Sequence, residues 1–358
     1  MSAEATRRPT LGRWLSDARS RRVLRYATGA MLAVALAMGV AWDLSFLTPV
    51  LSLTFLAAVG PPPTLRRGLT VAAIIAASCF TGLWVSEYLL PYPLVFFLVF
   101  GLLLLWLFYA QLGGTSPFLI TWLLIALLVL PMLAVQSPEL ARFVAAGIIT
   151  GAAATLVVVW LAYALIPEPR QTLDGNAPPK TSHAAKTAAP LTTEERFASA
   201  AVAAVVVLPV FFLFYLFEWT GGILVLVFVA LLSLQPGFAK DFKAGAALIV
   251  GNVIGGVAAV AMFELLTVVP EFSFLLLLTF LAGLLFGSRL MSTSPKAALF
   301  GMAFSTLLLV IGSTTTSAAG DATSKVYDRI LQLMIAVVYV VVAFGVIERY
   351  RRSRGSQS

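Results

Sequence analysis

Residues 94–110 read LVFFLVFGLLLLWLFYA, an apolar run without a single charged side chain. A helix needs about 20 such residues to cross the roughly 30 Å of hydrocarbon in a bilayer. A helix satisfies its backbone hydrogen bonds internally, whereas an open sheet edge cannot satisfy them in lipid. We therefore predict a membrane-spanning helix at 91–110.

The rest of the chain has the same character. Of its 358 residues, 60% are apolar and only 11% are charged, and the mean hydropathy is +0.97. In a soluble domain about a quarter of the residues are charged. Lipid is therefore the expected main solvent, and the composition predicts an all-α integral membrane protein.

Further apolar runs predict a total of about 12 transmembrane helices. In the first half they lie at 23–41, 44–60, 68–86, 116–135 and 141–166, and in the second half at 198–217, 220–235, 243–266, 271–288, 295–312 and 327–348. The runs at 44–60 and 220–235 are short, so each could instead be a re-entrant or tilted segment. Residues 167–195 are rich in proline, alanine, threonine and lysine, which predicts a flexible linker.

The basic residues predict the orientation. With the N-terminus inside, all 24 lysines and arginines except Arg142, Lys325 and Arg329 fall on the inner side. The positive-inside rule therefore predicts cytoplasmic termini in a multi-pass protein of the bacterial inner membrane. The net charge of +8 is explained by anionic lipid headgroups and needs no nucleic acid as a partner.

Short matches recur in the same order in both halves, which predicts an internal repeat. Thr115-Ser116-Pro117 matches Thr293-Ser294-Pro295, Glu87 matches Glu264, and Arg142 matches Arg329. We expect a basic segment at 1–22, a six-helix repeat at 23–166, a cytoplasmic linker at 167–195, a second six-helix repeat at 196–348 and a basic tail at 349–358. With an even number of helices, two parallel six-helix repeats insert the same way up, so a pathway is expected at their interface.

Arg142 and Arg329 are the candidate substrate-binding pair. Both lie on the side where the positive-inside rule disfavours cations, and the repeat relates them. A guanidinium binds carboxylates bidentately, so two arginines flanking a pseudo-twofold axis would bind an organic anion. The alternative is local, with Arg142 paired to Glu139 three residues earlier as an ordinary interfacial anchor.

Glu87 and Glu264 are a second repeat-related pair, at the outer ends of the third helix of each half. Such carboxylates could exchange protons and couple transport to the proton gradient, or could simply be solvated acids at helix ends. No carboxylate lies in the middle of a predicted span, so a passive or facilitated pathway stays open.

A few other residues could line a pathway or hold helices together. Asn252 lies between Gly251 and Gly255, whose small-xxx-small spacing allows close helix approach. Packing is the more ordinary interpretation of that segment. The remaining members of this group are Gln111, Thr115, Ser116, Thr293 and Ser294.

The residue inventory excludes several chemistries. The single cysteine, Cys79, lies in an apolar run, and the single histidine, His183, lies in the linker. No disulfide framework, metal cluster or haem motif follows from that pattern, and no P-loop motif is present. We expect no catalytic residue, no metal and no cofactor, and we do not expect an enzyme. The segment from Arg13 to Arg25 predicts a basic lead-in on the inner leaflet.

The pattern resembles the fusaric acid resistance (FUSC) superfamily. The resemblance rests on the order of six helices, a cytoplasmic linker and six more helices, and on a basic residue and a Gly-x-x-x-Gly spacing around the third helix of each half. In the second half these residues are Lys243, Gly251 and Gly255, and in the first half Arg67 and Gly82 match the pattern less well. The arginines that open the sixth helices, Arg142 and Arg329, are also similar. Aromatic acid exporters of that superfamily carry a sizeable soluble domain between the halves, whereas only residues 167–195 stand there in this chain. The resemblance implies efflux of aromatic carboxylic acids, alongside a periplasmic membrane-fusion adaptor.

Three functional hypotheses follow. The first is an inner-membrane exporter or anion permease for small organic or aromatic acids, acting as a monomer or a homo-oligomer. The second is a membrane scaffold subunit that recruits a partner protein through its basic tails. The third, an enzyme acting on lipid, is disfavoured because no histidine, cysteine or paired-carboxylate constellation lies at membrane depth.

Overall fold

The computed structural model describes residues 18–40, 44, 46–58, 63–167, 192–218, 223–234, 242–294 and 296–315, and six helical residues between 331 and 343. Every regular element in these ranges is an α-helix. The first half contains α2 (Ala18–Val40), α3 (Leu47–Ala57), α4 (Leu65–Leu89), α5 (Pro93–Leu112), α6 (Pro117–Gln136) and α7 (Pro138–Leu165). The second half contains α8 (Thr193–Leu216), α9 (Ile223–Ser233), α10 (Phe242–Val268), α11 (Phe272–Leu290) and α12 (Ala297–Thr315).

Eight helices in the described part of the chain are long and apolar enough to cross a membrane. They are α2, α4, α5, α6, α7, α8, α10 and α11. This confirms the prediction of an all-α, multi-pass membrane protein. The twelve crossings stay a prediction, and most of the helix expected at 327–348 lies outside the described residues.

The helix starts follow from local sequence. Proline occupies the first turn of α5, α6 and α7, where its fixed φ suits the helix and its missing N–H costs nothing. Thr192 and Glu195 form a capping box at the start of α8, with each side chain bonded to the other residue's backbone N–H. Thr64 caps α4 in the simpler way, by accepting from the N–H of Arg67.

The helices found in the runs at 44–60 and 220–235 are short. Both α3 and α9 have 11 residues, so each is about 16 Å long, roughly half of the hydrocarbon thickness. The backbone is extended at Ala58, directly after α3. Within the described residues neither helix is long enough to cross a bilayer alone, which favours the alternative of re-entrant or tilted segments, and a full crossing at these two runs stays a prediction.

Side chains of α7 hold α3 and the segment that follows it. Thr155 Oγ1 donates to the carbonyl oxygens of Gly151 and Thr48, at 2.9 and 3.3 Å. Thr48 Oγ1 donates to the Gly151 carbonyl at 3.4 Å, and Trp160 Nε1 donates to the Pro63 carbonyl at 2.8 Å. Irregular backbone in a membrane protein must be satisfied by neighbouring protein groups. Here Thr155 of α7 donates to α3 itself, and Trp160 of α7 donates to Pro63 in the segment after α3.

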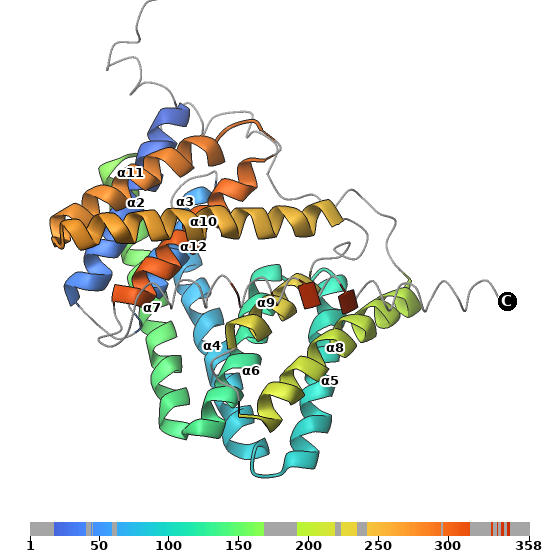
Figure 1. Cartoon of the computed structure of the whole chain (residues 1–358). Coiled ribbons are helices and arrows are strands. Elements are labelled where there is room, and N and C mark those ends of the chain that lie inside the picture. Colours follow the sequence, from blue (N-terminus) through green and yellow to red (C-terminus); the bar gives the residue numbers. More distant parts are fainter. Residues whose placement is uncertain are drawn as a thin grey trace, which may run out of the picture.

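The apolar core has two large parts, and each mixes helices of both halves. One joins buried residues of α2, α3 and α7 with those of α10, α11 and α12, among them Tyr26, Leu56 and Phe304. The other joins α4, α5 and α6 with α8 and α9, among them Phe100 and Phe211. Figure 1 shows the first group, with α2, α3 and α10 to α12, at upper left, and α5, α6, α8 and α9 at lower right.

Two antiparallel helix pairs form the main contacts between the halves, and they are packed differently. In the α2–α11 pair, Gly283 lies against Ala27 and Gly287 against the Tyr26 ring, so the backbones approach closely. In the α5–α8 pair, Phe100 stacks on Phe211 with 4.0 Å between ring centroids, and Phe96 stacks on Tyr215. We call these the glycine seam and the aromatic seam.

Candidate functional site

A cleft of about 390 Å³ opens where α4 and α6 end and α7 begins. Its walls are largely apolar, and its two charged members are Glu87 and Arg142. The lining residues are Leu83, Ser86, Glu87, Leu90, Pro91, Ala134, Pro138, Ala141 and Arg142. We call it the α4–α7 cleft. Its volume lies in the range of small-molecule sites, about 300–1,000 Å³.

Local sequence explains how the walls meet. Leu83, Ser86, Glu87 and Leu90 follow helical spacing, so they share one face of α4 at its last turns. A single residue, Ser137, connects the end of α6 to the start of α7, and its side chain accepts from the N–H of Leu140. This tight connection brings the first turns of α7 beside the end of α4.

Arg142 connects two carboxylates at the cleft. Its Nη2 lies 3.3 Å from Glu87 Oε1 across the cleft, and its Nη1 lies 3.1 Å from Glu139 Oε1 on its own helix. The side chains of Arg142 and Glu87 are 51% and 59% exposed. Exposed ion pairs of this kind contribute about 0–1 kcal/mol. The Glu87–Arg142 pair is therefore weak enough for a bound ion to replace one partner.

The structure brings together residues that the sequence placed in separate pairs. We expected Arg142 with Arg329 and Glu87 with Glu264, but Arg142 and Glu87 lie in one site. The local ion pair of Arg142 with Glu139 is confirmed. Arg329 lies outside the described residues. Glu264 is exposed on α10, which does not contribute to the α4–α7 cleft.

Gly251, Asn252 and Gly255 pack α10 against α12. Asn252 Oδ1 accepts a hydrogen bond of 2.5 Å from Thr306 Oγ1. A Cβ at Gly255 would collide with the carbonyl oxygen of Ala303, and one at Gly251 would meet the Leu299 carbonyl oxygen at 3.2 Å. These contacts favour the packing interpretation over the pathway interpretation for this segment.

The other polar candidates lie at helix ends, away from the α4–α7 cleft. Gln111 is in the last turn of α5, and its Oε1 is buried without a hydrogen-bond partner among the described residues. Thr115 and Ser116 connect α5 to α6, and Ser116 is exposed. Thr293 and Ser294 are exposed between α11 and α12, where Ser294 Oγ accepts from the Lys296 N–H.

Arg25 is a functional candidate that the sequence reasoning missed. We expected it in a basic lead-in on the membrane surface, but it belongs to α2 and is only 1% exposed. Its guanidinium carbon lies 3.9 Å from the centre of the Tyr163 ring on α7. The sequence did contain evidence that Arg25 lies within the helix, because its neighbours Leu24 and Tyr26 belong to the apolar pattern of α2.

No three His, Cys, Asp or Glu side chains gather as metal ligands would in the described part of the chain. The α4–α7 cleft combines largely apolar walls with the Glu87–Arg142 ion pair.

Comparison with known proteins gives one match. Residues 22–162 match the model of a family described as a protein of unknown function, DUF2955. The match runs from the start of α2 nearly to the end of α7 and covers less than half of the chain, which is therefore similar to this family over helices α2 to α7. No curated protein and no solved structure matches the chain. The match does not confirm the resemblance to the FUSC superfamily.

Proposed function

We propose that the chain is a membrane transporter, an exporter or anion permease, for small organic acids, and that the α4–α7 cleft is a substrate site. The observation that carries the proposal is the position of Arg142 beside a largely apolar cleft of about 390 Å³. An organic acid has an apolar body and one carboxylate. The cleft offers apolar walls for the body, and Arg142 offers the bidentate partner for the carboxylate.

The charges of the site set a condition for anion binding. With Glu87, Glu139 and Arg142 all ionised, the cluster carries a net charge of −1, which by itself repels an anion. A substrate carboxylate therefore has to replace the Glu87 carboxylate on Arg142, or bind when Glu87 is protonated. Replacement is feasible because the existing pair is exposed and weak.

This condition has a consequence for energy coupling. A proton on Glu87 frees Arg142, so proton and anion bind together at this site rather than in competition. Such coupling is reciprocal, so a bound anion also favours the proton on Glu87. A carrier that binds both ligands together moves both in the same direction. For the permease form of the proposal, this favours proton–anion co-transport or passive anion permeation. An exporter would have to take its energy from coupling elsewhere than at this cleft.

The proposal includes two parallel six-helix repeats with about twelve crossings. Its support is the reciprocal packing of the halves. The first helix of each half pairs with the fourth of the other, as α2 with α11 and α8 with α5. The second pairs with the fifth of the other half, as α3 with α12 and α9 with α6. A pseudo-twofold axis generates such exchanged pairs. The family match also covers about one six-helix unit.

The cellular setting is part of the same proposal. The charge bias favours cytoplasmic termini in a bacterial inner membrane, so that Arg142 and Glu87 face outward. A FUSC-like exporter would act with a periplasmic membrane-fusion adaptor. The apolar exposed faces of the long helices suit a lipid bilayer, and a homo-oligomer is compatible with them.

The test is transport of radiolabelled benzoate into proteoliposomes that contain the full chain. We expect Arg142→Ala to reduce benzoate transport at least about tenfold, because the substrate carboxylate loses one charge-assisted hydrogen-bonded contact. Arg142→Lys, which keeps the charge but loses the planar fork, should retain an intermediate rate.

Arg66→Ala is the matched control, because it removes an exposed arginine from the opposite end of α4. Size-exclusion chromatography in detergent checks that each variant is folded. Equal benzoate transport by folded Arg142→Ala and wild-type protein would exclude the cleft as the anion site.

A further inference from the structure

The charges at the α4–α7 cleft alternate in sign. Glu87 Oε1 and Glu139 Oε1 lie 3.3 and 3.1 Å from the two terminal nitrogens of Arg142, so one cation stands between two anions. All three side chains are more than half exposed, so a dissolved ligand can reach them. Two carboxylates and one guanidinium give the cluster a net charge of −1 when all three are ionised.

This arrangement favours a ligand that carries both charges. A monoanion changes the net charge of the occupied site from −1 to −2, and a monoamine leaves Arg142 without an anionic partner in the ligand. A zwitterion leaves the net charge at −1 and offers a carboxylate to Arg142 and an ammonium group to Glu87. Each charge of the ligand then lies beside a protein charge of the opposite sign.

Both protein groups keep hydrogen-bonding capacity for such a ligand. A guanidinium has five N–H donors. Those of Arg142 make one contact to Glu139 and one to Glu87 in the described part of the chain. Glu87 uses Oε1 for its contact, and its Oε2 makes no hydrogen bond to the residues that the structure describes. A zwitterion can therefore bind beside the Glu87–Arg142 pair without replacing it, whereas a benzoate ion has to displace Glu87.

The rest of the wall indicates the side chain of the ligand. Apart from Glu87 and Arg142, the polar side chain of the wall is Ser86, whose hydroxyl already donates to the Gly82 carbonyl at 2.7 Å. The other lining residues are leucine, proline and alanine. A cleft of about 390 Å³ with such walls suits a bulky apolar side chain.

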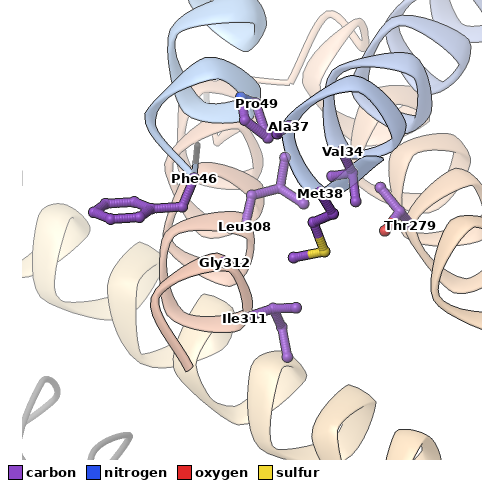
Figure 2. Close-up of a pocket in the computed structure, with 9 residues that line it drawn as sticks. All are labelled: Val34, Ala37, Met38, Phe46, Pro49, Thr279, Leu308, Ile311 and Gly312. Carbon is purple, nitrogen blue, oxygen red and sulfur yellow. The ribbon is translucent and has the colours of Figure 1, made fainter. Parts of the chain in front are cut away.

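The cavity between α2, the start of α3, α11 and α12 does not suit such a ligand. Figure 2 shows its lining residues, which are apolar except for Thr279. The enclosed space is about 10 Å³, close to the smallest space able to hold one water molecule. An amino acid therefore fits the α4–α7 cleft and not this cavity.

We propose that the preferred ligand of the α4–α7 cleft is a zwitterionic α-amino acid with an apolar side chain. Its carboxylate binds Arg142, its ammonium group binds Glu87, and its side chain lies against the apolar walls. The inference rests on the proposed function, in which Arg142 binds the substrate carboxylate, and it narrows the substrate class from organic acids to amino acids. Such a ligand binds while Glu87 is ionised, so its binding needs no proton on Glu87.

Three probes with the same phenyl group test the charge pattern. They are L-phenylalanine, 3-phenylpropanoate, which lacks the ammonium group, and 2-phenylethylamine, which lacks the carboxylate. Isothermal titration calorimetry with the full-length protein in detergent gives the Kd of each. We expect phenylalanine to bind about fivefold more tightly than either analogue, because each analogue loses one exposed ion pair. Equal or tighter binding of either analogue would overturn the inference.

Variants of Glu87 test the assigned contact. Glu87→Gln should weaken phenylalanine binding about fivefold and strengthen 3-phenylpropanoate binding, and a general loss of structure cannot produce these opposite changes. Glu87→Asp keeps the carboxylate and should still prefer phenylalanine to 3-phenylpropanoate. Glu271→Gln removes an exposed acid directly before α11 and should leave all three Kd values unchanged. An unchanged phenylalanine Kd in Glu87→Gln would contradict the proposed ammonium contact.

The outcomes separate this inference from the transport proposal. Benzoate transport that depends on Arg142, in a protein that does not prefer phenylalanine, would refute the amino-acid inference alone. Benzoate transport that does not depend on Arg142, together with the expected phenylalanine binding, would refute the transport proposal alone.

Discussion

Arg142 Nη2 lies 3.3 Å from Glu87 Oε1, although 55 positions separate the two residues in the sequence. The contact joins the end of α4 to the start of α7 at the cleft. It makes the candidate anion-binding group and the candidate proton-binding group direct partners. Any anion that binds Arg142 therefore changes the environment of Glu87, and a proton on Glu87 changes the availability of Arg142.

The first prediction concerns that competition. Glu87→Gln removes the carboxylate that competes for Arg142, so the affinity for benzoate should rise by up to about fivefold, equivalent to the roughly 1 kcal/mol of an exposed ion pair. The apparent KM for benzoate in proteoliposomes measures this. Glu271→Gln serves as the control, because Glu271 is an exposed acid directly before α11. A weaker benzoate affinity in Glu87→Gln would contradict the competition.

The second prediction concerns the buried arginine. Tyr163→Leu removes the ring under Arg25 and should lower the free energy of unfolding by about 2 kcal/mol, the size of a desolvated cation–π contact. Tyr163→Phe keeps the ring and should cost much less. Thermal unfolding in detergent compares the two. Equal losses in both variants would mean that the hydroxyl, not the ring, is the important group.

The third prediction concerns the α10–α12 contact. Gly255→Ala introduces a methyl group against the Ala303 carbonyl and should destabilise the protein by about 1–3 kcal/mol. Gly39→Ala is the natural comparison, because a Cβ at Gly39 meets no neighbouring atom within 4 Å in the part of the chain that the structure describes. It should be neutral or slightly stabilising, since alanine favours the helix. Similar Tm values for the two variants would show that α10 and α12 do not pack as closely as described.

The fourth prediction concerns the short helix α3. Trp160→Phe removes the donor to the Pro63 carbonyl and keeps an aromatic ring, so we expect a loss of about 1–2 kcal/mol of stability. Faster hydrogen exchange in the residues near Pro63 should accompany it. Trp84→Phe changes an exposed tryptophan and should alter neither quantity. Unchanged exchange near Pro63 would show that the indole does not hold this segment.

Much of the fold was predictable because lipid imposes simple rules. The apolar run at 91–110 became α5 at Pro93–Leu112, and the run at 116–135 became α6 at Pro117–Gln136. Length and hydropathy suffice for such helices. They did not give the length of α3, which covers only Leu47–Ala57 of the run at 44–60. The hydrogen bond from Thr155 of α7 to the first turn of α3 is a long-range contact that no local pattern shows.

The candidate site was predictable in its residues but not in its pairing. The internal repeat singled out Arg142 and Glu87 separately, because a repeat pairs each residue with its equivalent in the other half, Arg329 and Glu264. The contact between them depends on which helices are neighbours, and that is decided by the one-residue connection at Ser137. The buried hydroxyl of Thr279 on α11 was not singled out either, because a single hydroxyl in an apolar helix usually bonds its own backbone, whereas this one has no hydrogen-bond partner among the described residues.

The mixing of both halves in each core has a consequence for biosynthesis. Tyr26 and Ala30 of α2 belong to the same buried cluster as Phe304 and Leu308 of α12, which the ribosome reaches almost 280 residues later. The first half therefore enters the membrane with one face of α2 and α3 still lacking its protein neighbours. We expect insertion to proceed helix by helix during translation. Assembly of this cluster must wait for α12, and we expect truncated products that end after α7 to be degraded by membrane proteases.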